Sequence, residues 1–150
     1  MRFLQVTIMA VATLLTLASC GKQAPIDDAT QPKIEVTYNT IAGSWQLTHL
    51  DGSELLDATI LYILFDRDKR SFEMWTNIGS MYPRRSTGQY SILAEEDGTY
   101  TLQGSYDNGV GDWNDMYRVE MPTRDRMLWR SRTTGECMDF ARIESIPEFN

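Results

Sequence analysis

Hydrophobic and polar residues alternate along most of the chain from Ile41 onward. A period of two places successive side chains on opposite faces of a β-strand, so this pattern predicts an all-β domain. Eight strands are predicted, at residues 43–50, 60–65, 71–78, 87–93, 99–105, 115–121, 127–132 and 137–143. A short helix is also expected at residues 53–58, because Ser53 is a favourable N-cap residue.

Turn signals separate the predicted strands. Asp51-Gly52, Asp97-Gly98 and Asn108-Gly109 are dipeptides typical of tight turns, and the other gaps also contain glycine, proline or charged residues. Strands joined by short connections favour an antiparallel meander, and closing the sheet removes its exposed edges. We therefore predict an eight-stranded antiparallel up-and-down barrel formed by residues 40–150. A two-sheet sandwich, which has similar patterning but longer crossovers, is the alternative.

The alternation also predicts which side chains face the barrel interior. Eight strands enclose a space that side chains can just fill, or that can hold one small ligand. Six aromatic or methionine side chains are the candidate ligand-lining residues: Met74, Tyr90, Tyr100, Tyr117, Met138 and Phe140. Their bulk favours a shallow pocket at the mouth of the barrel. Alternatively, they form an ordinary packed core.

The N-terminus has the features of an exported protein. A positive Arg2 precedes an apolar stretch that is too short to span a bilayer comfortably, so residues 1–19 are expected to be a signal peptide. Leu17-Ala18-Ser19-Cys20 matches the lipobox of bacterial lipoproteins, in which the cysteine carries diacylglycerol and the new N-terminus an acyl chain such as palmitate. Residues 20–39 are then the lipidated cysteine and a polar, proline-containing tether.

The same resemblance indicates where the protein would be located. Gly21 follows the cysteine at a position where aspartate favours retention in the inner membrane of enteric bacteria. We therefore expect an outer-membrane lipoprotein of a Gram-negative cell, facing the periplasm. Exposure on the cell surface is the alternative, although the acidic residues Asp27 and Asp28 come late for a surface-export signal.

Charge and cysteine content narrow the range of partners. The 14 basic and 21 acidic residues give a net charge of −7, which disfavours nucleic acid as a partner. The sequence contains only two cysteines, Cys20 and Cys137. With lipid on Cys20, Cys137 is expected to be buried and inert, and pairing with another chain is the alternative.

No arrangement of residues typical of catalysis is found in the sequence. His49 is the single histidine, so a two-histidine metal site is excluded. The oxygen-rich loop at 106–115 lacks the spacing of a calcium-binding loop. The acidic residues at 95–97 are interpreted as a solvated hairpin tip. We therefore expect neither enzymatic activity nor a cofactor or metal.

The first predicted strand contains Gly43-Ser44-Trp45, which resembles the Gly-x-Trp motif that opens the barrel of lipocalins. In that family a late arginine packs across the tryptophan at the closed end, and Arg142 in the last strand is similar. Over residues 40–144 the chain resembles the lipocalin-like lipoproteins of Bacteroidetes. The resemblance implies a barrel with Trp45 and Arg142 as its closing pair.

The resemblance also implies a binding role. The predicted function is that of a membrane-anchored, lipocalin-like lipoprotein of the cell envelope, which binds a small apolar or amphipathic ligand in or at the mouth of the barrel. The alternative is a structural or accessory lipoprotein with a filled barrel, which docks onto an envelope protein partner.

Overall fold

The computed structural model describes residues 33–149. The predicted signal peptide, Cys20 and the tether up to residue 32 lie outside the described residues. The elements are α1 (Tyr38–Ile41), β1 (Gly43–Leu50), β2 (Ser53–Glu54), β3 (Leu61–Asp66), β4 (Ser71–Thr76), β5 (Arg84–Ala94), β6 (Tyr100–Tyr106), the 3-10 turn η1 (Asp107–Gly109), β7 (Gly111–Asp112), β8 (Tyr117–Thr123), β9 (Arg126–Ser131) and β10 (Cys137–Ile143). The protein is thus nearly all-β, as predicted.

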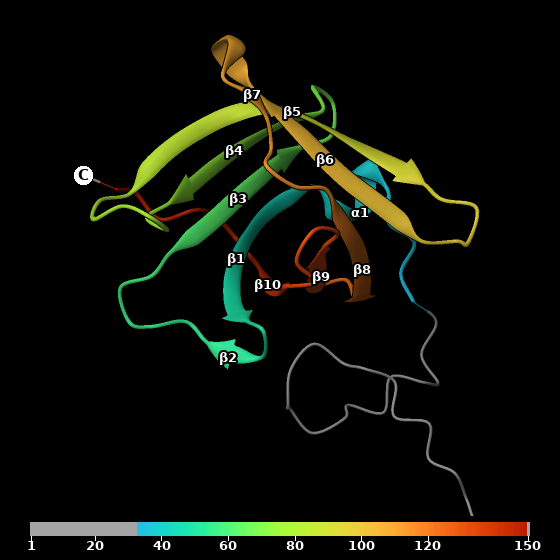
Figure 1. Ribbon diagram of the computed structural model, residues 1–150, viewed down its shortest axis with the longest axis horizontal. Helices are drawn as coiled ribbons and strands as arrows, with labels where there is room; N and C mark the ends of the chain where they lie inside the picture. The colour runs from blue at the N-terminus through green and yellow to red at the C-terminus, as the bar shows by residue number, and fades with distance from the viewer. Residues whose placement is uncertain (1–32, 150) are drawn as a thin grey trace, which may run out of the picture.

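Eight of these strands form a closed antiparallel barrel (Figure 1). Each long strand pairs with the next in the order β1, β3, β4, β5, β6, β8, β9, β10, and β10 pairs back with β1 through Ser44↔Ile143 to Leu50↔Met138. The predicted up-and-down barrel is confirmed. The sandwich alternative is wrong, because the ladder of strand pairs closes on itself.

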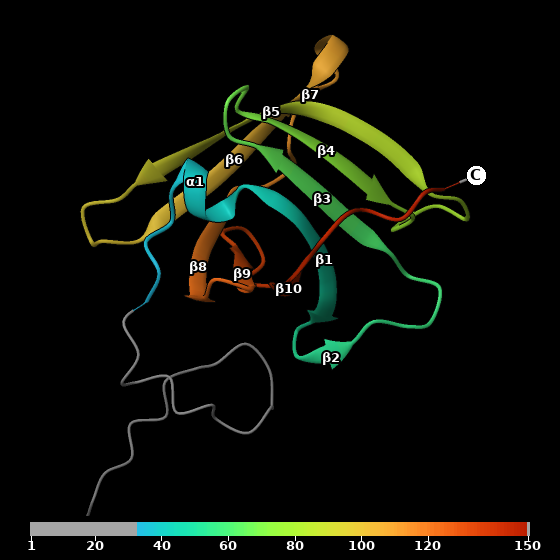
Figure 2. The ribbon, with the colours of Figure 1, turned by 180° about the vertical axis from the view of Figure 1, so that it is seen from behind.

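The strand register defines two ends of the barrel. At the α1 end, β1 begins at Gly43, and α1 lies beside the start of β1 (Figure 2). At the opposite end, here called the mouth end, β1 ends at Leu50, β4 ends at Thr76 and β6 ends at Tyr106. The connections β2–β3, β4–β5, β6–β8 and β9–β10 therefore all lie at the mouth end.

The helix predicted at 53–58 is not present. Asp51 and Gly52 have φ values of 48° and 77°, which gives a tight turn after β1. This turn returns the chain antiparallel to β1, where Ser53 pairs with Leu50 and Glu54 with His49. Pairing with the neighbouring strand therefore prevails over the capping tendency of Ser53.

Residues 33–39, which the sequence analysis assigned to a tether, pack against the barrel. Val36 is 3% exposed, and Ile34 forms a β-bridge with Met121. Thr37 and Thr40 form a capping box at the start of α1. This part of the predicted tether therefore belongs to the folded unit.

The C-terminal strap, residues 144–149, crosses the outside of the barrel. Figure 2 shows it passing over β1 and β3. The ring centroid of Phe149 lies 5.8 Å from that of Tyr62 and 5.1 Å from that of Trp75. The strap thus covers Tyr62 on the outer face of β3, whereas Leu64 on the same face stays exposed.

Candidate functional site

The α1 end of the barrel is closed by Trp45 and Arg142. The Arg142 guanidinium lies 4.2 Å from the centre of the Trp45 ring, and its nitrogens donate to the carbonyl oxygens of Ala42 (2.6 Å) and Thr40 (2.8 Å). Trp45 Nε1 donates to the Ile41 carbonyl at 2.8 Å. This is the geometry predicted for the pair, and it ties the end of β10 to the backbone before β1.

The remaining interior is filled largely by aromatic rings. We use the name aromatic cluster for Phe72, Trp113, Tyr117, Trp129 and Phe140. Trp129 is at its centre, with ring centroids 4.7 Å from Phe140, 5.2 Å from Tyr117 and 5.7 Å from Trp113. Trp113 also contacts Phe72 edge-on at 5.0 Å. Such offset and edge-to-face contacts are the preferred arrangements of aromatic side chains.

Trp113 reaches the interior from a loop rather than from a barrel strand. β8 pairs with β6 only at Tyr100–Leu102, and beyond that point β7 takes the place of β8 beside β6. Trp113 N then donates to the Gly104 carbonyl at 2.8 Å. The Trp113 ring lies so close to Gly104 that a Cβ at residue 104 would stand 2.3 Å from ring atom Cε2. Glycine at 104 therefore makes room for the indole.

Three buried polar atoms in the part of the chain that the structure describes have no hydrogen-bond partner: Tyr90 Oη, Trp113 Nε1 and Trp129 Nε1. A buried donor without an acceptor costs on the order of 1–3 kcal/mol. The other two indoles differ, since Trp45 donates to Ile41 and Trp75 donates to Glu73 Oε1 at 2.8 Å. Unsatisfied indole N–H groups are thus confined to the aromatic cluster.

Burial keeps the interior tyrosines uncharged. Desolvation raises the pKa of Tyr90 to about 12 and that of Tyr117 to about 12, and it also raises the pKa of Tyr106. These hydroxyl groups therefore stay protonated at physiological pH. The interior offers neutral hydrogen-bond donors and aromatic surface to any bound molecule.

The six predicted ligand-lining residues do not converge on one cavity. Tyr117 and Phe140 belong to the aromatic cluster, and Met138 is the strand partner of Trp129. The other three divide between the two halves of the barrel: Met74 lies on β4, whereas Tyr90 and Tyr100 lie toward the α1 end. All six are buried or packed against the buried core.

Neither Trp113 nor Trp129 is among the ligand-lining residues predicted from the sequence. Trp129 could have been found, because it alternates with Met127 and Ser131 on one face of β9. Trp113 gave no such signal, since it lies between short strands in a glycine- and aspartate-rich loop. Only the tertiary structure places its ring in the interior.

Two surface depressions lie outside the barrel interior. One, of about 470 Å³, lies between the second half of β1 and the β2–β3 loop. The other, of about 480 Å³, lies on the outer face of β3, β4 and β5. None of the six predicted ligand-lining residues borders either depression.

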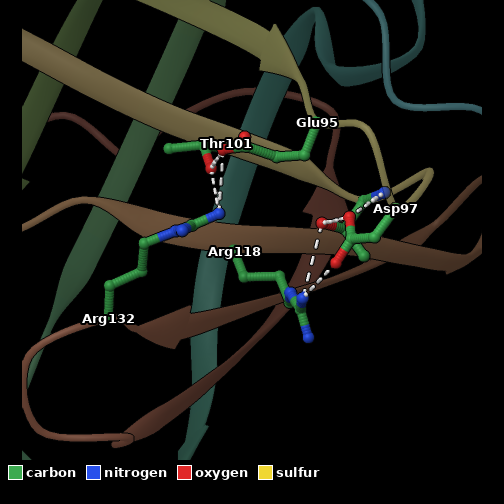
Figure 3. Close-up of polar contacts among 6 residues, drawn as sticks. Glu95, Asp97, Thr101, Arg118 and Arg132 are labelled. Carbon is green, nitrogen blue, oxygen red and sulfur yellow. Dashed lines mark hydrogen bonds and ion pairs between the residues drawn. The ribbon is translucent and has the colours of Figure 1, made fainter.

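The acidic hairpin between β5 and β6 takes part in a charged cluster on the outer wall (Figure 3). Arg132 donates to Glu95 at 2.9 Å, and Arg118 donates to Asp97 at 3.0 Å. Hydrogen bonds from Thr99 and the positive charge of Arg118 hold the pKa of Asp97 below its usual value. Glu95 and Asp97 are thus paired with guanidinium groups, which tie the hairpin to the neighbouring strands, while the tip at 96–98 is exposed, as predicted.

Apolar side chains are concentrated on the loops of the mouth end. Of eight exposed large hydrophobic residues among 33–149, six lie there: Leu56, Ile78, Met81, Tyr82, Val110 and Met116. Met81 is 88% exposed and Leu56 is 83% exposed. The turns at the α1 end are instead mostly charged, as at 67–70 and 95–97. The two ends of the barrel therefore present different chemistry to their surroundings.

Cys137 is buried, with 3% of its surface exposed, as predicted. Its sulfur is part of a disulfide bond, which differs from the expected inert thiol.

His49 Nδ1 lies 3.0 Å from Thr48 Oγ1 at the mouth end of β1. Within residues 33–149 no group of three histidine, cysteine, aspartate or glutamate side chains is arranged to hold a metal ion. Nor does any helix in that range have the length and apolarity to cross a membrane.

Comparison with known proteins gives no relative. No protein-family description matches the chain, and neither a curated protein nor a solved structure shows significant similarity to it. The function of the chain is therefore inferred from its own residues.

Proposed function

We propose that this protein is a lipid-anchored envelope protein that binds a small apolar or amphipathic molecule inside its barrel, against the aromatic cluster. The fold supports this proposal, because a closed eight-stranded barrel can hold one small ligand. The buried side chains of the core, such as Trp129, Phe140 and Met127, are uncharged, which suits an apolar partner.

One observation carries the proposal. The Trp129 side chain is 2% exposed, yet its N–H group has no acceptor among the described residues. A protein retains such a donor at a cost in stability, and a bound molecule with a suitable acceptor would remove that cost. The neighbouring Trp113 N–H has the same property. A ligand at the aromatic cluster accounts for both donors together.

Quenching of tryptophan fluorescence by a neutral apolar probe with a carbonyl acceptor, 2-acetylnaphthalene, tests the proposal. We expect saturable quenching by the purified protein. In the Trp129→Phe variant the apparent Kd should rise at least about fivefold, which corresponds to one lost contact of about 1 kcal/mol. The matched control is Trp75→Phe, because Trp75 lies on the outer wall against Phe149. The absence of saturable binding, or equal effects of both variants, would overturn the proposal.

The anchor is proposed from the lipobox at residues 17–20. Several acyl chains together anchor a protein stably, whereas one chain alone is marginal. Cys137 is disulfide-bonded, and Cys20 is the only other cysteine in the sequence. A thioether to lipid on Cys20 and an intrachain Cys20–Cys137 disulfide exclude each other. The mass of the mature chain, with labelling by palmitate, decides between them, and Cys20→Ser should abolish the label.

The proposed location is the outer membrane, with the barrel facing the periplasm. Gly21 rather than aspartate after the cysteine supports this assignment. Protease treatment of intact cells should leave the chain uncut. Complete cleavage would place the barrel on the cell surface instead.

Docking onto an envelope protein is a second candidate function, supported by the six exposed apolar residues of the mouth end. Protein–protein contact surfaces are often enriched in such methionine and aromatic side chains. A double substitution, Met81→Ser with Tyr82→Ser, should then abolish copurification of a partner while leaving probe quenching unchanged. If the double variant retains the partner, the mouth-end loops are not the docking surface.

A further inference from the structure

The Trp113 ring occupies a flat slot in the barrel wall. The Gly104 backbone forms one side of the slot, at a distance that excludes even a Cβ. The Trp129 ring forms the other side, inclined by 28° to Trp113. Phe72 and Tyr117 meet the indole edge-on, each at an interplanar angle of 65°. This slot has the shape and chemistry of a site for a planar fused-ring system, and it is filled by a side chain from the protein itself.

The segment that carries Trp113 runs from Asp107 to Asp115, and side-chain hydrogen bonds fix both of its ends. At the first end, Asp107 accepts a hydrogen bond from Thr87 Oγ1 at 2.7 Å. At the second end, Asp115 accepts hydrogen bonds from Ser131 and, at 2.9 Å, from Thr133. Between these two residues, within the described part of the chain, no side chain forms a hydrogen bond. Trp113 is also the only buried residue from 107 to 116. Apart from the short backbone pairing of β7 with β6 and the bond from Trp113 N to the Gly104 carbonyl, its ring is what holds this stretch inward.

The backbone of this segment adopts a conformation that requires glycine. Gly111 has φ +106°, and a Cβ at residue 111 would meet nothing within 4 Å. An alanine there would be strained by its backbone angle alone, without touching the interior. The segment projects beyond the barrel wall at η1 (Figure 1). Its outward movement would break the two-residue pairing of β7 with β6 and the bond from Trp113 N to the Gly104 carbonyl, but it would leave the pairing of the eight long strands intact.

We infer that the slot filled by Trp113 is a binding site for a neutral, planar aromatic molecule with a hydrogen-bond acceptor, which enters when Trp113 swings out. This inference rests on the proposed function and specifies its ligand class. The Trp129 N–H, which lacks a partner, donates to the acceptor. A neutral ligand is favoured because the slot contains no charged side chain and the protein carries a net charge of −7.

The binding of prodan, a neutral naphthyl ketone with environment-sensitive emission, tests the inference. Strain in Gly111→Ala destabilises the conformation in which Trp113 fills the slot. This raises the fraction of molecules able to bind, so the apparent Kd should fall at least about fivefold. The matched control is Gly98→Ala, because Gly98 also has positive φ (+78°) with nothing within 4 Å of a Cβ, but lies in the β5–β6 turn at the α1 end. Its Kd should stay within about twofold of the parent value.

Competition by 2-undecanone, a flexible aliphatic ketone, tests the ligand class. We expect it to displace prodan at least about tenfold more weakly than an unlabelled naphthyl ketone does, a difference of about 1.4 kcal/mol. Equal competition would overturn the planar class while leaving ligand binding intact. Equal effects of Gly111→Ala and Gly98→Ala on the Kd would overturn entry through the Trp113 slot. If neither ketone binds any variant, the proposed function fails together with the inference.

Discussion

The guanidinium of Arg142 lies 4.2 Å from the centre of the Trp45 ring. This contact joins the last strand of the barrel to the first, where Trp45 and Arg142 are also register partners across the closing pair. Trp45 has no exposed surface. The two residues therefore close the sheet and fill its α1 end at the same time.

Replacing Trp45 with alanine should lower the free energy of unfolding by about 3–5 kcal/mol, as for other large core truncations. Trp75→Ala is the control, since the Trp75 ring lies outside the barrel. Trp75→Ala should lower the free energy of unfolding by clearly less. Urea unfolding of both variants measures the difference, and a Trp45→Ala protein as stable as the parent would contradict a closing role.

Gly104→Ala should force the Trp113 ring out of its slot, because the new Cβ would overlap ring atom Cε2. We expect a loss of about 1–3 kcal/mol in stability, typical of overpacking, and stronger quenching of tryptophan emission by acrylamide. In a Trp113→Ala background, Gly104→Ala should lower the stability only slightly. An unchanged cost in that background would show that Gly104 is needed for another reason.

Low pH should weaken the hydrogen bonds of Asp115, which fix the second end of the Trp113 segment. Burial raises the pKa of this carboxyl, but hydrogen bonds from Ser131 and Thr133 outweigh burial and hold the pKa below its usual value. A folded-state pKa below the unfolded one stabilises the fold above about pH 4, and this contribution is lost as the pH falls through the folded value. The stability difference between the parent and Asp115→Ala should therefore shrink between about pH 7 and pH 3. A difference independent of pH would contradict this role of the carboxylate.

Phe149→Ala should loosen the C-terminal strap from the outer wall. The Phe149 ring contacts Tyr62 and Trp75, and such aromatic pairs contribute about 0.5–1.5 kcal/mol each. We expect a small loss of stability, of about 1–2 kcal/mol, with prodan affinity unchanged. A change in prodan affinity would mean that the strap, rather than the Trp113 segment, controls access to the interior.

The sequence predicts the barrel well because alternation is a strong local signal. All eight long strands were found, and β1 and β10 have the predicted bounds. The elements that were missed are short: α1 has four residues, and β2 and β7 have two each. Runs of that length show no periodicity. The false helix at 53–58 reflects a local capping preference, which strand pairing at Glu54 overrides.

The candidate site was harder to predict than the fold. Alternation gives the face of the sheet on which a side chain lies but not its position along the barrel axis. The sequence therefore places Tyr90 and Tyr117 in one ligand-lining group, although they lie in opposite halves of the barrel. Trp113 enters the interior where the partner of β6 changes from β8 to β7, which only the strand register reveals. Unpaired donors such as Trp129 Nε1 are likewise a property of the packed structure.

Indole N–H signals in a two-dimensional nitrogen–proton spectrum test the central claim most directly. The chain has four tryptophans, and two of them, Trp45 and Trp75, already donate to oxygens of the protein. On titration with prodan the Trp129 signal should shift downfield as it gains an acceptor, and the Trp113 signal should move as its ring leaves the slot. Trp45 and Trp75 should stay in place. A spectrum that does not change at saturating prodan, or in which only Trp75 shifts, would contradict ligand binding inside the barrel.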